Sequence, residues 1–438
     1  MNITSSIRAL VCYAILITGT AYAQDQESTQ AGARCQGPAI SPAPGQIVVD
    51  RENPAWFRYH EGGPFFISGP GDPEGFLYLG TRNPDGTRDG DQMKIINRMA
   101  GTGANCIYLM AIRSHGGDGD STQNPYINSD LSQGLSEPIL AQWETWFRAM
   151  DEHGIVIFFI FFDDDADPFG RELPADGELK PQTTEFIDAM VDRFKHHKHL
   201  IWCVAEEYLE GFTKEHAEKV AQRIRERDDR GHPIAIHQNE GTSFDFKGSP
   251  YFDQFAVQWN KPTPEELNAG TVAAWKDVEG RVNINIAEFM IGGEELPFSG
   301  TGEELRRKIW AIAMGGGYSM AIGMDLITTP IEDLKYCGRL VRFMEATRFP
   351  ETAPRNDLAR AQTTYVLAKP GHVYIAYSET GSQLGLAMLA GRYEIKWCNP
   401  VTGTWVNEGV REIAEGDQVF ERPAGFQNET ALYLSNVP

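Results

Sequence analysis

Cysteine is scarce in this chain of 438 residues, and the spacing of the six cysteines excludes two common roles. The cysteines are widely separated and none forms a C-x-x-C pair, so neither a zinc site nor a disulfide framework is indicated. Cys12 falls in a segment that we expect to be removed, which leaves an odd number. Cys106 and Cys203 lie inside apolar runs, so we expect both to be buried thiols.

Basic residues are also in short supply. The chain has 39 Lys and Arg against 61 Asp and Glu, and its formal charge is −22 at pH 7. A protein this acidic is a poor partner for nucleic acid or an anionic membrane, because both are themselves negatively charged. We therefore expect neither as a partner, and a polyanionic substrate is disfavoured unless a local basic cleft offsets the overall charge.

Long apolar runs are missing, and the N-terminal apolar stretch is a short one. Arg8 precedes a mostly apolar stretch at 9–20, which is followed by an Ala-Tyr-Ala triplet ending at Ala23. This is the pattern of a secretory signal, and the apolar stretch is too short to span a membrane well. The sequence predicts a cleaved signal peptide at 1–23, a polar disordered leader at 24–45, and a secreted or periplasmic protein.

Between residues 46 and 349, apolar runs with strand composition alternate with amphipathic helical patterns. The apolar runs lie at 65–68, 105–112, 155–162, 200–208, 233–237, 252–259, 282–289 and 318–324. Helical patterns follow most of them, although no long helix follows 233–237. Eight such units predict a (β/α)8 TIM barrel of α/β class. An open doubly wound sheet is the alternative, but no Gly-rich phosphate loop follows any run.

The pattern changes after residue 350. Short strand-like runs are separated by turn signals such as Lys-Pro-Gly at 369–371 and Glu-Thr-Gly at 379–381, and no helical period remains. The sequence therefore predicts a catalytic barrel at 46–349 followed by a C-terminal antiparallel β-sandwich at 350–438. We expect the sandwich to brace the barrel, and glycan binding is the alternative.

Carboxylates stand where two of the apolar runs end. The run at 200–208 reaches Glu206 and Glu207, and the run at 282–289 reaches Glu288. Ionisable side chains are excluded from the middle of a strand buried on both faces, but not from its end. In a parallel barrel the carboxyl ends of the strands form the active-site face. Two carboxyl groups about 5–5.5 Å apart can cleave a glycosidic bond with retention, and a gap of about 6.5–9.5 Å gives inversion.

These two stretches resemble strand endings of the retaining clan A glycoside hydrolases. Trp-Cys-Val-Ala-Glu-Glu at 202–207 is similar to their fourth strand, where an Asn-Glu pair follows an apolar run and Glu is the acid/base. Ile-Asn-Ile-Ala-Glu-Phe at 284–289 resembles their seventh strand, which supplies the nucleophile. The resemblance implies that Glu207 is the acid/base and Glu288 the nucleophile. Glu206 stands in place of the Asn, which usually holds the 2-hydroxyl of the sugar.

The C-terminal part extends this resemblance. The stretches at 374–377 and 396–403 are similar to the β-sandwich, of putative collagen-binding type, that follows barrel glycosidases of the apiosidase-like kind. The resemblance thus covers most of the mature chain. It implies a carbohydrate substrate and requires no organic cofactor and no metal.

Glu206 and Glu207 present a geometric difficulty. Adjacent residues of a strand point to opposite faces, so both face one cleft only if the end of the strand is bulged. Either member of the pair is therefore open as the acid, and the other can be a structural partner of a barrel Arg or Lys.

Other strand ends supply candidate sugar contacts, each with a structural alternative. Arg113 and His115 follow the second run, and Arg113 is a candidate to orient the nucleophile or, equally, a loop ion pair. His237 ends the fifth run and is either a hydroxyl ligand or a structural histidine. Trp259 offers a flat face for a pyranose or packs in the core. Asp164 is a sugar-binding or solvated loop carboxylate, and a cation site there is a weaker option.

Two other classes of function compete with the hydrolase. A non-catalytic carbohydrate-binding barrel would keep its function after a Glu207→Gln change. A polysaccharide lyase would use a base such as His237 or Tyr208 and leave unsaturated, ultraviolet-absorbing ends. Release of reducing ends without that absorbance would separate the hydrolase from both.

Overall fold

The computed structural model describes residues 40–166, 168–239, 241–290, 302–426 and 429–437. The expected signal peptide and most of the expected leader lie outside these residues. The chain divides into Met1–Gln36 and Gly37–Pro438, and all described residues belong to the second unit. In the described ranges, no helix is both long and apolar enough to cross a membrane.

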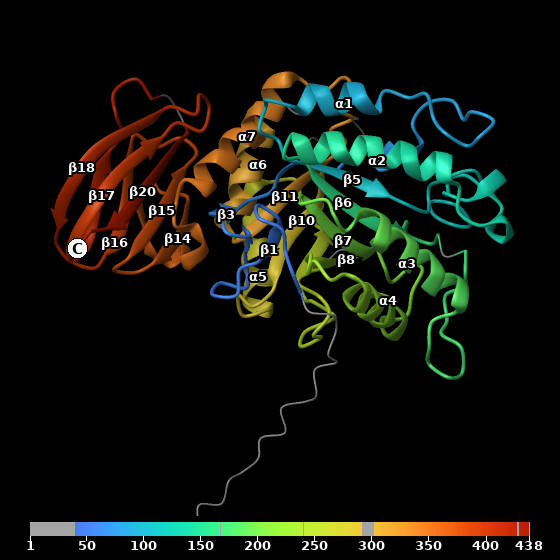
Figure 1. Cartoon of the computed structure of the whole chain (residues 1–438). Coiled ribbons are helices and arrows are strands. Elements are labelled where there is room, and N and C mark those ends of the chain that lie inside the picture. The colour runs from blue at the N-terminus through green and yellow to red at the C-terminus, as the bar shows by residue number, and fades with distance from the viewer. Residues whose placement is uncertain (1–39, 167, 240, 291–301, 427–428, 438) are drawn as a thin grey trace, which may run out of the picture. The chain divides into compact units, whose positions relative to one another are not determined.

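Eight parallel strands form the central sheet (Figure 1). In spatial order they are β4 (Ser68–Pro70), β11 (Gly317–Ile322), β10 (Asn283–Met290), β9 (Gln254–Gln258), β8 (Ile234–Gln238), β7 (Leu200–Ala205), β6 (Val156–Phe162) and β5 (Cys106–Met110). The two outer strands meet where the N–H of Asn105 donates to the carbonyl of Ser68 at 3.3 Å. The Asn105 side chain also accepts from the N–H of Ser68 at 3.0 Å. The sheet thus closes on itself, which confirms the TIM-barrel prediction.

Helices cover the outside of this sheet (Figure 1). They are α1 (Gln92–Met99), α2 (Glu137–Glu152), α3 (Pro181–Phe194), α4 (Lys214–Arg227), α5 (Pro264–Asp277), α6 (Gly302–Met314) and α7 (Ile331–Glu345). Local signals start several of them: the Thr263 side chain accepts from the N–H of Glu266, and Pro264 occupies the first turn of α5. As the sequence indicates, the described residues between β8 and β9 contain no helix.

Burial explains why the strands were visible in the sequence. Every residue of β5, β6 and β7 is buried, because helices cover one face of a parallel barrel and the barrel core covers the other. The first strand begins later than expected. Phe65 belongs instead to a small antiparallel sheet of β1 (Ile47–Val49), β2 (Phe57–Tyr59) and β3 (Pro64–Phe65), and the barrel strand starts at Ser68.

Two antiparallel sheets follow the barrel. One has the order β12 (Ala353–Pro354), β14 (Tyr365–Lys369), β15 (Val373–Ser378), β20 (Thr430–Asn436), β17 (Gly391–Cys398) and β18 (Trp405–Ile413). The other has the order β13 (Ala359–Ala361), β16 (Gln383–Met388) and β19 (Gly416–Glu421). Sequence reasoning missed β18 and β19 because most of their side chains are exposed and carry little apolar pattern.

Helices α6 and α7 contact these sheets through buried groups. The Arg306 guanidinium makes a two-pronged ion pair with Glu429, at 2.8 Å from Nε and 2.5 Å from Nη2. The Tyr377 hydroxyl donates to the same carboxylate at 3.0 Å. Trp310 stacks on Tyr377 with ring centroids 4.9 Å apart. Within the described residues, Cys106, Cys203, Cys337 and Cys398 are free and buried.

Candidate active site

The two carboxylate-bearing stretches converge at the carboxyl ends of β7 and β10. One oxygen each of Glu206 and Glu288 and one ring nitrogen of His237 all lie within 4.8 Å of one another. Because β8 and β9 separate β7 from β10 in the sheet order, these side chains meet across the mouth of the barrel rather than along one strand pair. Parallel barrels carry their catalytic groups at this end.

The backbone at the end of β7 departs from strand geometry, so Glu206 and Glu207 need not point to opposite faces. Strand β7 ends at Ala205, and Glu207 has a φ of 36°, in the left-handed region that a non-glycine residue seldom adopts. The alternation of a strand therefore stops before the pair. Strand β10 is also irregular, since its register with β9 shifts between Ile286 and Glu288. Such bulges redirect a side chain and are frequent beside active sites.

Two amide side chains hold Glu288. Gln258 Nε2 donates to Glu288 Oε1 at 2.8 Å, and Asn260 Nδ2 donates to the same oxygen at 3.3 Å. The backbone carbonyl of Glu288 accepts from the N–H of Trp259 at 2.8 Å. Sequence reasoning missed both amide residues, although polar residues on either side of Trp259 at the end of an apolar run were a usable signal.

Glu206 is the deeper member of the pair. Its side chain is almost fully buried, and Oε1 lies 3.2 Å from His237 Nδ1. Burial, followed by the charge of Glu288, raises the pKa of Glu206 to about 10. At neutral pH it is therefore a neutral acid that can donate a hydrogen bond.

His237 contacts both Glu206 and Glu207. Its ring is fully buried, and burial lowers its pKa to about 4, so the imidazole is neutral near pH 7. Nδ1 accepts from the N–H of Glu207 at 3.3 Å and lies 3.1 Å from the Tyr108 hydroxyl. The proton of the ring is thus assigned to Nε2. Through Nδ1, His237 thus contacts Glu206, Glu207 and Tyr108, and sugar binding by His237 stays a prediction.

Glu207 is half-buried, at the more open side of the mouth. Its Oε2 accepts from Asn239 Nδ2 at 3.0 Å, and the same nitrogen lies 3.0 Å from Glu210 Oε1. Burial raises the pKa of Glu207 to about 9, with further contributions from Glu206, Glu210 and Glu288. Glu207 therefore carries a proton at neutral pH and remains more accessible than Glu206.

Arg113 lies between the carboxyl groups of Asp163 and Glu74. Its Nε lies 3.1 Å from Asp163 Oδ2, and Nη1 lies 3.5 Å from Glu74 Oε2, so the guanidinium forms a buried ion pair. The orienting contacts of Glu288 come from amides instead. Burial raises the pKa of Glu74 to about 8 and that of Asp163 to about 6, although Arg113 opposes both shifts. Sequence reasoning missed Glu74, which follows β4.

His115 and Asp164 lie in the loops that follow β5 and β6. His115 is exposed, and its Nδ1 lies 2.9 Å from the Ser114 hydroxyl. Asp164 is half-buried, and burial followed by the charge of Asp118 raises its pKa. Sugar binding by His115 and by Asp164 stays a prediction.

Trp259 packs against helix α5. Its Nε1 donates to the carbonyl of Glu266 at 3.3 Å, and its ring lies so close to Gly270 that a Cβ there would overlap it. The ammonium of Lys261 lies 4.5 Å from the ring centroid. The ring is half-buried, and stacking of a sugar on Trp259 stays a prediction.

Comparison with known proteins identifies the fold. No protein-family profile and no curated protein matches the sequence. A glycoside hydrolase of family 5 from Bacteroides vulgatus is 15% identical, with a TM-score of 0.64 over 90% of this chain and 94% of that one. A second glycoside hydrolase structure is 14% identical, with a TM-score of 0.63 over 90% of this chain and 99% of that one. At this level of sequence identity, the likeness establishes the fold alone: the barrel and the C-terminal sheets share the fold of these two glycoside hydrolases.

Proposed function

We propose that this protein is a retaining glycoside hydrolase of poly- or oligosaccharides, exported by its signal peptide. Glu288 attacks the anomeric carbon, while Glu207 protonates the leaving oxygen and then activates water. The observation that carries the proposal is the convergence of two strand ends at the barrel mouth, where one oxygen each of Glu206 and Glu288 lies within 4.8 Å of the other. Glu207 follows Glu206 directly in the chain, and we expect its carboxyl group to be the partner of Glu288. A retaining pair needs a separation of about 5–5.5 Å, and an inverting pair needs about 6.5–9.5 Å.

Accessibility favours Glu207 over Glu206 as the acid/base. The acid/base has to reach the leaving oxygen and later a water molecule, and the half-buried Glu207 is better placed for both than the buried Glu206. Its raised pKa keeps the proton that the first step needs. Formation of the glycosyl ester removes the charge of Glu288, which is one cause of the raised pKa. The pKa of Glu207 then falls, which suits its second role as a base.

Glu206 has a distinct role in this scheme. In the related enzymes an Asn amide at this position holds the 2-hydroxyl of the sugar. A neutral carboxylic acid can also donate one hydrogen bond, so Glu206 can replace the amide as long as it keeps its proton. Its raised pKa supports that state.

Buried polar atoms near the mouth support a hydroxyl-rich ligand. Within the described residues, His237 Nε2, Asn239 Oδ1 and Asn260 Oδ1 are buried and have no hydrogen-bond partner. Buried polar atoms are nearly always hydrogen-bonded in native proteins, so three buried polar atoms without partners beside three glutamates are unusual. Sugar hydroxyls can both donate and accept, and they match this mixture of donor and acceptor atoms.

The lyase alternative lacks an available base. His237 is fully buried and neutral at its core position. The Tyr208 hydroxyl donates to Asp245 at 2.6 Å, and burial raises the pKa of Tyr208 further above its usual range. Neither group is both exposed and easily deprotonated, which is what proton abstraction from a uronic acid would require.

An activity screen tests the proposal. The purified protein is incubated with a panel of neutral glycans, and we expect reducing ends to appear without ultraviolet-absorbing ends. Proton NMR of the first product should show the anomeric configuration of the substrate. The Glu288→Ala variant should be inactive on the same glycan, and activity that survives in it would remove the nucleophile assignment. Binding without turnover by the wild type would favour the non-catalytic alternative.

A further inference from the structure

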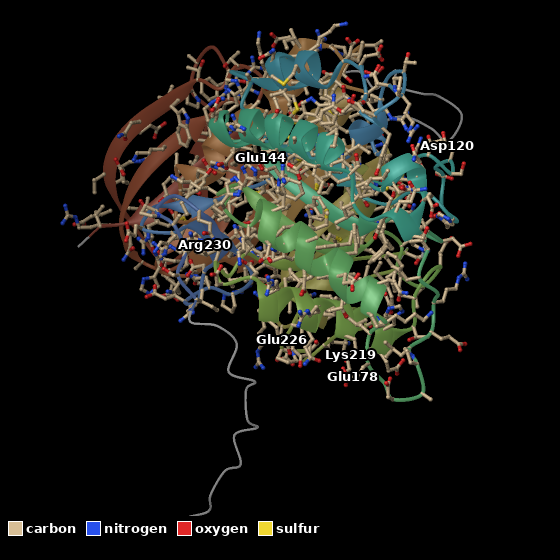
Figure 2. The ribbon with its side chains drawn as sticks, turned by 45° about the vertical axis from the view of Figure 1, so that its right-hand side comes forward. Asp120, Glu144, Glu178, Lys219, Glu226 and Arg230 are labelled. Atoms are coloured by element: carbon tan, nitrogen blue, oxygen red, sulfur yellow. The ribbon has the colours of Figure 1, made fainter. Side chains whose placement is uncertain are left out.

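A second cluster of ligand-type side chains lies at the opposite end of the barrel strands. Glu144 belongs to α2, and His196 and His197 lie in the segment that joins α3 to the start of β7. Figure 2 labels Glu144 beside α2, and its side chain is 18% exposed. Because this segment precedes β7, the cluster is separated from Glu206 and Glu207 by the length of that strand.

The three side chains point at one another. His196 Nε2 lies 3.1 Å from Glu144 Oε1, and His197 Nε2 lies 3.3 Å from Glu144 Oε2. One ligand atom from each residue lies within 4.8 Å of the other two. The side chain of His196 is 54% exposed, so the cluster is open to solvent, while that of His197 is only 2% exposed and anchors it to the core.

We propose that Glu144, His196 and His197 bind one divalent transition-metal ion of the zinc class. Two imidazole nitrogens and one carboxylate oxygen are ligands that Zn²⁺, Ni²⁺, Co²⁺ and Cu²⁺ prefer, whereas Mg²⁺ and Ca²⁺ prefer oxygen alone. Bonds of about 2.0–2.2 Å at tetrahedral angles hold donor atoms roughly 3.4 Å apart. The two imidazole nitrogens lie 3.1 and 3.3 Å from the two oxygens of the Glu144 carboxylate, which is close to that spacing. A fourth position is left for water.

Asp151 prepares His197 for this role. Its Oδ2 lies 3.9 Å from His197 Nδ1, and its Oδ1 lies 2.7 Å from His199 Nδ1. A carboxylate on the Nδ1 side favours the tautomer with its proton on Nδ1, which leaves the lone pair of Nε2 for the metal.

A bound metal ion would link two elements that are distant in the sequence. Glu144 and His196 are 52 positions apart in the chain, and the bound ion would link α2 to the segment that leads into β7. An ion that binds only the folded protein stabilises it in proportion to the logarithm of its concentration over the dissociation constant. The site therefore predicts a metal-dependent rise in thermal stability that does not depend on the proposed glycosidase activity.

The test uses the full-length protein without an affinity tag, after treatment with a chelator. Calorimetric titration with ZnCl2 should show one ion per chain, and Zn²⁺ but not Mg²⁺ should raise the unfolding temperature. His196→Ala should abolish both effects while unfolding at the metal-free temperature of the wild type, because the side chain is largely exposed. His372→Ala, which removes an exposed histidine from the C-terminal sheets, should bind as the wild type does.

Two outcomes would overturn the proposal. One is the absence of stoichiometric binding, or binding that persists unchanged in both His196→Ala and Glu144→Gln. The other is loss of binding in Glu288→Gln with full binding in His196→Ala. That result would place the ion on Glu206, His237 and Glu288 at the mouth, which also have ligand atoms within 4.8 Å of one another.

Discussion

Glu207 has to give up a proton in one step and take one back in the next. The Glu207→Gln variant should lose about 10²–10⁴-fold in kcat/KM on a natural glycan, because that is the usual contribution of an acid/base group. The loss should be much smaller for the first step on an aryl glycoside with a good leaving group, and added azide should restore turnover. Steady-state kinetics with and without azide measure both effects.

The matched control is Glu210→Gln. Glu210 is exposed and shares the Asn239 amide with Glu207, so its loss tests whether any carboxylate near Asn239 has the same effect. Rescue by azide in Glu206→Gln instead of Glu207→Gln would exchange the two roles.

The alkaline side of the pH profile belongs to the same carboxyl group. Since the pKa of Glu207 is raised to about 9, its proton is retained through neutral pH and is lost above that value. We expect kcat/KM of the wild type to fall above about pH 9 and the fall to disappear in Glu207→Gln on the activated substrate. If kcat/KM falls above about pH 9 in the same way in both proteins, a group other than Glu207 causes the fall.

Glu206 makes stability depend on pH. Its pKa rises from 4.5 to about 10 on folding, so the native protein keeps a proton that the unfolded chain releases. This contribution to stability is complete below the unfolded pKa and is lost as pH rises toward the folded pKa. The raised pKa values of Glu74, Asp72 and Asp163 act in the same direction.

Thermal unfolding of Glu206→Gln checks this dependence. Between about pH 5 and about pH 8 the unfolding temperature of the wild type should fall, and the slope should be shallower in Glu206→Gln, which cannot titrate. Glu152→Gln, at an exposed position of α2, serves as the control and should keep the wild-type slope. Equal slopes in all three proteins would contradict the buried, protonated state of Glu206.

Helix α6 and the segment before β20 are joined by the buried pair of Arg306 and Glu429. The side chains are only 7% and 0% exposed. Replacing Glu429 by Ala leaves a buried guanidinium without its partner, which should lower the free energy of unfolding by about 3–5 kcal/mol. Urea denaturation measures the change.

A surface pair provides the comparison for that loss. Arg360 and Asp417 form a pair at 2.9 Å whose side chains are 40% and 65% exposed, and Asp417→Ala should cost about 0–1 kcal/mol because exposed pairs are weak. The double variant Arg306→Met/Glu429→Leu should recover most of the loss. Equal losses at the two pairs would argue against a bracing contact at Arg306.

Across the whole molecule, acidic residues dominate the composition, and several carboxyl groups gather at the mouth of the barrel. The formal charge is −22, and several carboxyl groups near the mouth raise one another's pKa. The guanidinium of Arg113 is already paired with Asp163 and Glu74, so it is not available to a substrate anion. We therefore expect neutral glycans to be cleaved and their carboxylated derivatives to be poor substrates.

Paired substrates measure that preference. The same neutral glycan with and without carboxymethyl groups should differ in KM, and added salt should reduce the difference because it screens charge. Faster cleavage of the carboxymethylated form would show that a basic contact dominates the cleft instead.

The amino-acid sequence by itself determined the barrel, the antiparallel sheets after it and the positions of the three glutamates. These features are local in the chain: a strand buried on both faces reads as an apolar run, and its end is where a carboxylate becomes tolerable. Thus β6 and β7 were recognisable, whereas the mostly exposed β18 was not.

The tertiary structure alone decided how those residues are used. The left-handed backbone at Glu207, the pairing of Arg113 with Asp163 and the amides on Glu288 all depend on contacts between segments distant in the sequence. A pKa follows from the burial and charge of such neighbours, so no pattern along the chain separates the protonated Glu206 from the more open Glu207. The sequence also did not indicate that Glu144 lies close to His196 and His197, because α2 and the start of β7 meet only in the folded barrel.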